Sequence, residues 1–415
     1  MKQSQEIATP ACRNEALRPA GTSSRHGGTP RNDNFLSMLT IKGDNESVRV
    51  AIVHDWLTGM RGGERCLEVF CELFPQADLY TLLHIPGSVS PRIEQMPIRT
   101  SFVQRLPFSK RGYRRYLPLF PMAVEHFNLK GYDLILSCSH CVAKGVIPPP
   151  EALHISYTLT PMRYAWDMYG EYFGENRSRM IPFFIHYLRI WDVTSSERVD
   201  YFLCISNHVK NRVKKYYRRE AEIVHPPVET NRFRIREEQK DFFLIVSSFA
   251  PYKRIDLALE AFNRLGYSLK IIGTGQEGKR LKSIAKSNIE FLGWQPDPVV
   301  ADCYSKCRAL IFPGEEDFGI VPLEAMASGR PVIAYGRGGV LETMIPYSPE
   351  EGRDPTGLFF HEPTVDSLID GVERFTRLER DFDPVTIRTH ALQWDRDIFK
   401  ERLKANIFKK MESKC

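Results

Sequence analysis

Two kinds of hydrophobic pattern alternate along the chain from residue 48 onward. Short continuous apolar runs predict strands that are buried on both faces, whereas apolar residues that return every three or four positions predict amphipathic helices. In the first half of the chain we expect strands at 49–53, 133–137 and 154–157, and helices at 64–73, 182–197 and 206–218.

The second half repeats this alternation more regularly. We expect strands at 242–247, 269–272, 289–292, 309–312, 331–334 and 357–360, and helices at 255–265, 276–286, 298–306, 320–328 and 364–377. Strands that alternate with helices of this length imply right-handed crossovers and a parallel, doubly wound sheet. Two such units in tandem predict an α/β protein of two Rossmann-like domains, with parallel sheets facing across a cleft. Because open α/β sheets bind ligands at the carboxyl ends of their strands, we expect the functional site in that cleft.

The same pattern divides the chain into four parts. Residues 1–47 are polar and have no hydrophobic period, which predicts a disordered extension. We assign an N-terminal domain to 48–230 and a C-terminal domain to 231–390, because a Pro-Pro dipeptide and a charged run between them are typical of a connector. Residues 391–415 are left for a C-terminal helix that could cross back to the N-terminal domain.

Composition narrows the class of protein further. The chain has 415 residues, 42% of them hydrophobic and 26% charged, which suits two globular domains. A net charge of +6 is too small for a dedicated nucleic-acid binder, and nine cysteines do not suggest a disulfide scaffold. No apolar run reaches the roughly 20 residues that span a bilayer. We therefore expect a cytoplasmic protein, which could lie peripherally at the inner face of the membrane.

The segment 312–329 carries the most specific chemistry. A buried strand ends at Phe312, a polar loop follows, and a helix is expected to start near 319–321. The free backbone N–H groups of Gly319, Ile320 and Val321 would point into the cleft with the positive end of the helix dipole. This arrangement predicts a binding site for a diphosphate.

Two carboxylates accompany this helix start. Glu316 stands on the loop and Glu324 lies one turn into the helix, with seven residues between them. They could therefore bind different parts of an extended ligand, such as a hexose and a ribose. In the alternative interpretation, Glu316 is a charge at a helix N-terminus and Glu324 is a surface residue. Charge and spacing alone leave both interpretations open.

The block Glu316-Asp-Phe-Gly-Ile-Val-Pro-Leu-Glu324 closely resembles the donor-site motif of family-4 retaining glycosyltransferases, which have the GT-B fold. Residues 251–254 (Pro-Tyr-Lys-Arg) resemble the family's phosphate-binding lysine segment, and 273–275 (Gly-Thr-Gly) its glycine turn beside the nucleotide. In the first half, 54–57 (His-Asp-Trp-Leu) and 61–64 (Arg-Gly-Gly-Glu) resemble the glycine loop. Residues 160–167 resemble a subgroup that includes bacterial polysaccharide mannosyltransferases. The resemblance covers about residues 48–380.

The resemblance implies a transferase that moves a hexose, mannose in that subgroup, from a nucleoside-diphosphate sugar such as GDP-mannose to a glycan or lipid-linked acceptor. Glu316 and Lys253 would be catalytic, and Glu324 would bind the ribose. The other implied donor-binding residues are Gly62, Gly63, Arg254, Gly273, Gly275, Phe318, Gly319, Ile320 and Val321. On the acceptor or sugar side we place Asp55, His140, Lys144 and Arg163.

We expect no cofactor and no metal site. The two Asp-x-Asp triplets, at 381–383 and 395–397, lie in a late charged region and not at a strand end, so we interpret them as solvated helix charges. The neutralising groups would instead be Lys253, the N-terminus of the helix at 319–321 and the glycine turn at 62–63. The pair Cys138-x-x-Cys141 lacks a second pair at zinc spacing and is interpreted as structural thiols.

Two positions depart from the family pattern. Ser248 stands where an arginine usually contacts the diphosphate, and Leu159 stands where a histidine usually lies near the donor sugar. Arg254 could replace the missing cation, and His140 with Lys144 could supply a polar group. These departures keep an alternative open, namely a catalytically impaired partner of an assembly complex that binds nucleotide sugar or glycan.

The segment 101–124 interleaves five basic and five aromatic residues and has no acidic residue. A solvated face is the simplest interpretation. The same pattern suits an anionic bilayer, or single-stranded nucleic acid in a third functional alternative. The modest net charge argues against nucleic acid. The sequence thus predicts a peripheral, salt-sensitive contact with an anionic membrane surface.

Overall fold

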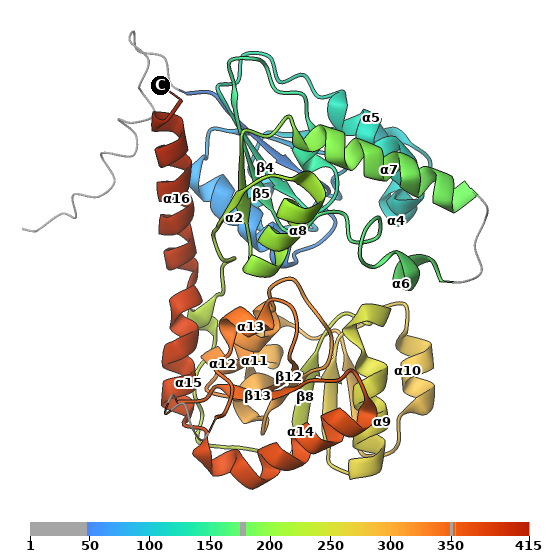
Figure 1. The fold of residues 1–415 in the computed structure, drawn as a ribbon, viewed down its shortest axis with the longest axis vertical. Helices are drawn as coiled ribbons and strands as arrows, with labels where there is room; N and C mark the ends of the chain where they lie inside the picture. Colours follow the sequence, from blue (N-terminus) through green and yellow to red (C-terminus); the bar gives the residue numbers. More distant parts are fainter. Residues whose placement is uncertain (1–47, 175–179, 349–351, 353, 415) are drawn as a thin grey trace, which may run out of the picture. The chain divides into compact units, whose positions relative to one another are not determined.

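In the computed structural model, residues 49–415 form one compact unit. The structure describes residues 48–174, 180–348, 352 and 354–414 (Figure 1). The disordered extension expected at 1–47 therefore lies outside the described residues.

The first half contains a seven-stranded parallel sheet with the strand order β3-β2-β1-β4-β5-β6-β7. The order reverses between β1 and β4, so a topological switch point lies at their carboxyl ends. The strands in the middle of the sheet are buried along their whole length, because helices cover both faces. The strands are β1 (Val50–His54), β2 (Asp78–Thr81), β3 (Ile98–Thr100), β4 (Leu134–Ser139), β5 (Leu153–Thr158), β6 (Tyr201–Cys204) and β7 (Ala221–Ile223).

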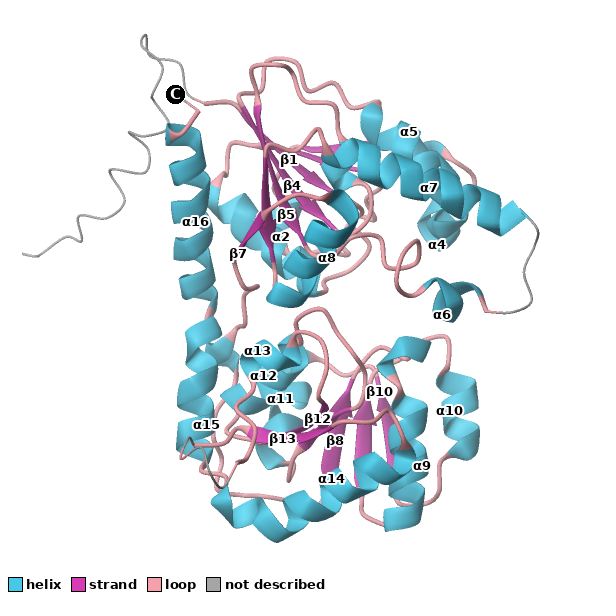
Figure 2. Cartoon of the chain, in the orientation of Figure 1, coloured by secondary structure: helices cyan, strands magenta, loops and turns pink. Residues whose placement is uncertain are grey.

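The helices of this half pack around the sheet (Figure 2). The first helix begins at the glycine turn, where the backbone N–H of Arg61 donates to the Glu64 carboxylate at 3.0 Å and closes a capping box. The helices are α2 (Gly62–Leu73), α3 (Pro91–Glu94), α4 (Ser109–Gly112), α5 (Phe120–Glu125), α6 (Tyr169–Phe173), α7 (Met180–Ser196) and α8 (Asn207–Tyr217).

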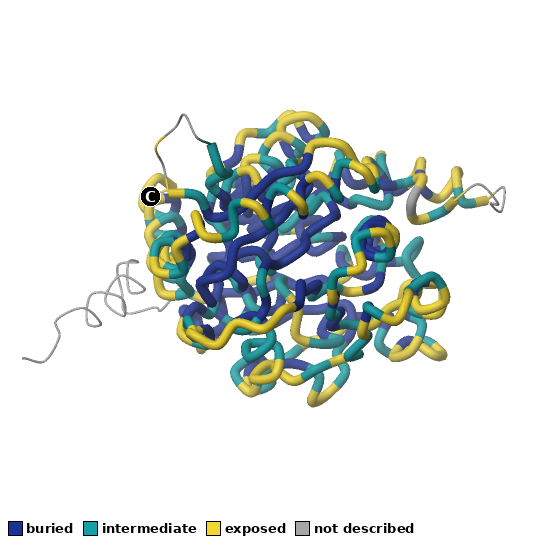
Figure 3. Tube along the Cα trace, turned by 90° about the horizontal axis from the view of Figure 1, so that it is seen from below, coloured by how far each residue is buried: buried dark blue, intermediate teal, exposed yellow. Residues whose placement is uncertain are grey.

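The second half contains a six-stranded parallel sheet with the order β10-β9-β8-β11-β12-β13. All six strands expected from the sequence are present, as β8 (Phe243–Val246), β9 (Leu269–Ile272), β10 (Ile289–Gly293), β11 (Leu310–Phe312), β12 (Val332–Tyr335) and β13 (Gly357–Phe360). The crossover helices are α9 (Ile255–Leu265), α10 (Gly278–Ile284), α11 (Asp297–Lys306), α12 (Ile320–Ala327), α13 (Val340–Thr343) and α14 (Val365–Leu378). Buried segments run through the interior and exposed ones lie outside (Figure 3).

The chain ends with α15 (Pro384–Ala391) and α16 (Arg396–Glu412), and α16 returns to the first half. Its Phe399 ring lies 5.7 Å from the ring of Tyr157 in β5. Arg396, at the start of the helix, pairs with Glu72 of α2 at 2.5 Å. The C-terminal helix therefore closes over the first sheet. The domain boundaries expected at 230 and 390 stay predictions.

Candidate functional site

A cavity of about 350 Å³ opens between the two sheets. The first half contributes residues 60–63, 65 and 66, together with Leu159 and Ile205. The second half contributes Glu316, Glu324 and residues 318–321. The cavity therefore brings the predicted glycine turn and the predicted diphosphate site together.

The start of α12 is shaped by backbone packing. Gly319 precedes the helix with φ +92°, a conformation that favours glycine. Gly339 donates its backbone N–H to the Glu316 carbonyl at 2.8 Å. A Cβ on Gly339 would lie 2.3 Å from the Cα of Phe318, so only glycine fits against this loop. The loop that carries Glu316 is consequently held by main-chain contacts.

The two predicted catalytic residues contact each other. The Lys253 ammonium forms an ion pair with the Glu316 carboxylate, and the side chains are only 14% and 20% exposed. Gly314 allows this contact, because a Cβ there would lie 2.7 Å from the Tyr252 carbonyl oxygen. The two loops at the ends of β8 and β11 thus meet at the cavity.

Glu324 is a partly buried acid in the same helix, and it lines the cavity. Its carboxylate accepts a hydrogen bond from the Tyr304 hydroxyl at 3.0 Å. Burial raises the pKa of Glu324, and the positive charge of Arg65 opposes this shift. Glu324 is therefore a lining residue of the cavity with a hydrogen-bond partner, and not a freely solvated surface charge.

The glycine turn leaves room where the two halves approach. A Cβ on Gly62 would lie 3.0 Å from the Cδ1 of Ile320, and one on Gly63 would lie 2.9 Å from the Cδ1 of Leu159. Leu159, at the position where the resemblance would place a histidine, thus forms an apolar part of the cavity wall.

The remaining donor-side predictions do not line this cavity. Gly273 and Gly275 pack on the backbone of 247–249, where a Cβ would lie 1.8 Å from the Ser247 carbonyl oxygen and 2.6 Å from the Phe249 nitrogen, respectively. Arg254 has a left-handed backbone and lies 3.4 Å from the Asp256 carboxylate. These residues shape the β8 loop and are not among the residues that line the cavity.

Asp55 has a different position from the one predicted. It is fully buried and accepts four backbone N–H groups from residues 140–143, at 2.6–3.0 Å. The His140 ring also approaches it, with Nδ1 at 3.0 Å. Burial alone would raise the pKa of Asp55, but the charge and hydrogen bonds of His140 hold it well below its usual range. Asp55 therefore positions His140 and is not itself open to a ligand.

Arg163 is engaged by a residue that the sequence did not single out. Its Nε donates to the Asp317 carboxylate at 2.7 Å, and Arg212 pairs with the same carboxylate. The Ser206 hydroxyl donates to the Asp317 carbonyl at 2.5 Å. Asp317 is thus a buried link between the two halves, and Arg163 belongs to that link.

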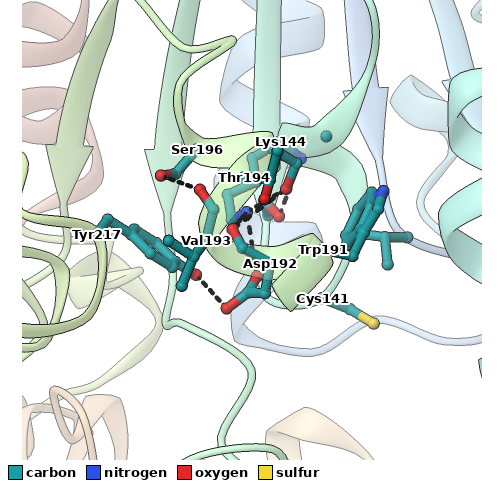
Figure 4. Close-up of polar contacts among 12 residues, drawn as sticks. Cys141, Lys144, Trp191, Asp192, Val193, Thr194, Ser196 and Tyr217 are labelled. Atoms are coloured by element: carbon teal, nitrogen blue, oxygen red, sulfur yellow. Dashed lines mark hydrogen bonds and ion pairs between the residues drawn. The ribbon is translucent and has the colours of Figure 1, made fainter. Parts of the chain in front are cut away.

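Lys144 is a second correction, because it lies inside the first half and is 2% exposed (Figure 4). Its Nζ is 3.0 Å from the Asp192 carboxylate of α7 and donates to the Ser195 hydroxyl at 2.8 Å. Asp192 also accepts hydrogen bonds from the Trp166 indole at 2.8 Å and from the Tyr217 hydroxyl at 2.9 Å. Burial lowers the pKa of Lys144. Because the ammonium is buried and paired, neither a sugar donor nor a glycan acceptor can reach it.

Two cations in the cavity wall were missed. Arg61 and Arg65 flank the glycine turn and line the cavity opposite α12. Their position in the sequence could have indicated this role, since both arginines lie within two residues of Gly63 in the predicted glycine turn. They provide positive charge on the side of the cavity that faces the start of α12.

Nothing in the described part of the chain forms a group of three His, Cys, Asp or Glu residues that could hold a metal ion. In the two Asp-x-Asp triplets, Asp383 and Asp395 cap α15 and α16. Cys138 and Cys141 are buried free thiols, in agreement with a structural role.

Residues 227–384 match the family described as Glycosyl transferases group 1. An uncharacterized glycosyltransferase of Methanocaldococcus jannaschii is 31% identical over 157 residues, which are 37% of this chain and 44% of that protein. An O-antigen chain mannosyltransferase of Salmonella typhimurium is 30% identical over 161 residues, 35% of this chain and 45% of that protein. The aligned part spans less than half the length of these curated relatives.

Solved structures match over most of the chain. Sucrose-phosphate synthase from Thermosynechococcus elongatus has a TM-score of 0.66 at 15% identity, covering 88% of this chain and 100% of that one. The lipopolysaccharide outer core galactosyltransferase has a TM-score of 0.59 at 16% identity, with the same coverage. An Anabaena protein in complex with UDP has a TM-score of 0.64 at 13% identity, covering 87% and 99%. The GT-B fold expected from the sequence is confirmed.

Proposed function

We propose that this protein is a retaining glycosyltransferase that moves a hexose from a nucleoside-diphosphate sugar to a glycan or lipid-linked acceptor. The observation that carries the proposal is the cavity in which the start of α12, Glu316 and Glu324 face the glycine turn. The match of residues 227–384 to the family described as Glycosyl transferases group 1 supports the same activity.

In this proposal, the diphosphate lies at the first turn of α12. The free N–H groups of Gly319, Ile320 and Val321 donate to its oxygens, and the helix dipole favours its negative charge. Lys253 lies next to this position, and the guanidinium groups of Arg61 and Arg65 approach from the first half. Together these groups stabilise the charge that develops on the leaving diphosphate.

The two glutamates act on the two ends of the donor. Glu324 accepts hydrogen bonds from the ribose hydroxyls, and Glu316 accepts them from the sugar. When the donor enters, its diphosphate replaces Glu316 as the partner of Lys253 and frees the carboxylate for the sugar. The bond from the sugar carbon to the diphosphate breaks, the acceptor oxygen bonds to that carbon on the same face, and the departing phosphate oxygen takes the hydroxyl proton.

Mannose is the proposed sugar, with GDP-mannose as a candidate donor. The support is the resemblance of residues 160–167 to polysaccharide mannosyltransferases and the similarity to the O-antigen chain mannosyltransferase. His140 is the proposed polar group beside the donor sugar, because the buried Asp55 carboxylate orients its ring through Nδ1.

A second candidate is a partner that binds nucleotide sugar without transfer. The observation that favours it is Leu159, which puts an apolar wall where the resemblance expects a histidine. Donor screening separates the two candidates, because only the transferase releases nucleoside diphosphate when an acceptor glycan is added.

Thermal-shift titration with GDP, UDP, ADP and their hexose conjugates tests the proposal first. A nucleotide at 100 times its Kd adds about 2.7 kcal/mol to the free energy of unfolding. Glu324→Ala is expected to weaken binding of the preferred nucleoside diphosphate about tenfold or more, because a charge-assisted hydrogen bond is lost. Equal affinity of the variant and the parent would contradict the ribose role. No stabilisation by any nucleotide would contradict the function.

A further inference from the structure

Helix α7 exposes apolar side chains where a surface helix normally has polar ones. Phe183, Tyr187 and Ile190 are 65%, 41% and 55% exposed. Their spacing places them on one side of the helix, opposite the buried Ile185 and Leu188. The helix is therefore apolar on both its inner and its outer side.

The polarity of α7 is inverted. The helix contains one acidic residue, Asp192, and this carboxylate points into the core toward Lys144 (Figure 4). Its one arginine, Arg189, donates to the Ala165 carbonyl at 2.6 Å, and the helix contains no lysine. Both charged side chains therefore point away from the outer side of the helix. Phe183, Tyr187 and Ile190 form an outer apolar face without an acidic residue, lysine or arginine.

Elements near α7 also expose apolar side chains (Figure 1). Helix α5 is tied to α7 by a hydrogen bond from the Trp191 indole to the Glu125 carboxylate at 2.8 Å. Met122 of α5 is 48% exposed, and Phe108, just before α4, is 80% exposed. Exposed apolar surface on this scale indicates an interaction site.

The adjoining segment supplies the charge. Five basic side chains are exposed in the segment between β3 and α5. Among the described residues, none of the five forms an ion pair with an acidic side chain. They are Arg105, Lys110, Arg111, Arg114 and Arg115. A second copy of this chain on the same face would bring like charges together, whereas an anionic lipid surface complements them.

We propose that the outer face of α7, with Phe108 and Met122 beside it, docks this protein on an anionic lipid bilayer. Phe183 and Tyr187 would sit at the level of the lipid head groups, where aromatic side chains are favoured. Among the described helices, none is long and apolar enough to cross a membrane, so the contact is peripheral. Membrane binding does not require sugar transfer, so this proposal is tested independently of the proposed function.

Co-sedimentation of the full chain with vesicles tests the proposal. The wild type is expected to bind vesicles of mixed phosphatidylglycerol and phosphatidylcholine at low salt, and to bind pure phosphatidylcholine weakly. The double variant Phe183→Gln/Ile190→Gln should lower the partition coefficient about tenfold or more, because it removes apolar side-chain area that the bilayer would bury. The matched control is Trp294→Gln/Val385→Gln, whose side chains are 75% and 63% exposed in the second half. This control should bind as the parent does.

The charge contribution is tested separately. Replacing Arg111, Arg114 and Arg115 with glutamine should abolish the preference for anionic vesicles, and unchanged melting temperature and nucleotide affinity show that each variant is folded. No binding by the wild type at low salt would overturn the proposal, as would equal binding by the Phe183→Gln/Ile190→Gln variant. A concentration-dependent dimer that this variant abolishes, without vesicle binding, would show instead that the face joins two copies.

Discussion

At the scale of single residues, the candidate site contains charges that are paired with one another inside the chain. Glu316 is the clearest case, because Lys253 neutralises it next to the start of α12. A carboxamide at position 316 keeps the size of the side chain but loses the negative charge. It can no longer stabilise the positive charge that develops on the sugar as the bond to the diphosphate breaks.

We therefore expect Glu316→Gln to lower the transfer rate by more than about tenfold, or about 1.4 kcal/mol of barrier, with little change in nucleotide affinity. Steady-state transfer with the identified donor and acceptor, together with a nucleotide titration, provides the measurement. Glu315→Gln is the matched control from the same loop, since Glu315 does not line the cavity. Unchanged turnover of Glu316→Gln would remove Glu316 from the mechanism.

His154 makes a different residue-scale prediction, which concerns stability. It is buried in β5 between the Ser137 hydroxyl at 2.9 Å and the Arg198 carbonyl at 3.0 Å. Burial lowers its pKa to about 4 from the ordinary value of 6.5. Between these pH values the unfolded chain binds the proton and the folded chain does not, so the free energy of unfolding falls as the pH falls.

Between pH 7 and pH 5 this residue should cost about 2 kcal/mol of stability. Urea unfolding at the two pH values gives the total change, and the difference between the wild type and His154→Gln isolates the histidine. If both proteins lose the same stability, His154 is charged in the fold or accessible to water.

At the scale of elements, the Lys144–Asp192 pair joins the turn after β4 to α7, and Trp166 and Tyr217 add a loop and α8. Removing one partner of a buried pair leaves the other charge uncompensated. We expect Lys144→Met to lower the free energy of unfolding by about 3–5 kcal/mol. Lys215→Met, on the exposed side of α8, is the control and should change stability by less than about 0.5 kcal/mol. Chemical denaturation measures both, and equal stability would show that the pair contributes little.

At the scale of the whole molecule, the cavity takes its positive groups from both sheets. The start of α12 lines it from the second half, where Lys253 pairs with the lining residue Glu316. Arg61 and Arg65 line it from the first half. Asp317 links the halves through Arg163 and Arg212. The two halves together therefore supply the positive charge that the proposed diphosphate site needs.

Because these groups can neutralise a diphosphate themselves, we expect transfer without a divalent ion. Activity after EDTA treatment and desalting should stay within about twofold of the untreated enzyme, because no Lewis acid is needed to stabilise the leaving group. Activity that EDTA abolishes and Mg²⁺ or Mn²⁺ restores would contradict this prediction.

Much of the fold could be predicted from the sequence, because alternating strands and helices leave a local hydrophobic period. All six strands of the second half are predicted by their apolar runs, whereas β2, β3, β6 and β7 of the first half are not. These four strands have only three or four residues, and β2, β3 and β7 also contain polar residues. The block from Glu316 to Glu324 could also be recognised from the sequence, because its features are local. Its strand end, glycine and helix start follow one another directly.

The two α/β units, the helix start at Gly319 and the glycine turn follow from local sequence, because backbone geometry and hydrophobic period act between near neighbours. The partners of the charges, in contrast, depend on the tertiary fold. Lys144 meets Asp192 and Arg163 meets Asp317 across 48 and 154 residues. It also decided that one side of α7 stays exposed, since an apolar helix has the same sequence pattern whether both sides are covered or one. Side-chain pairing and burial depend on which distant elements the fold brings together, and no local pattern records that.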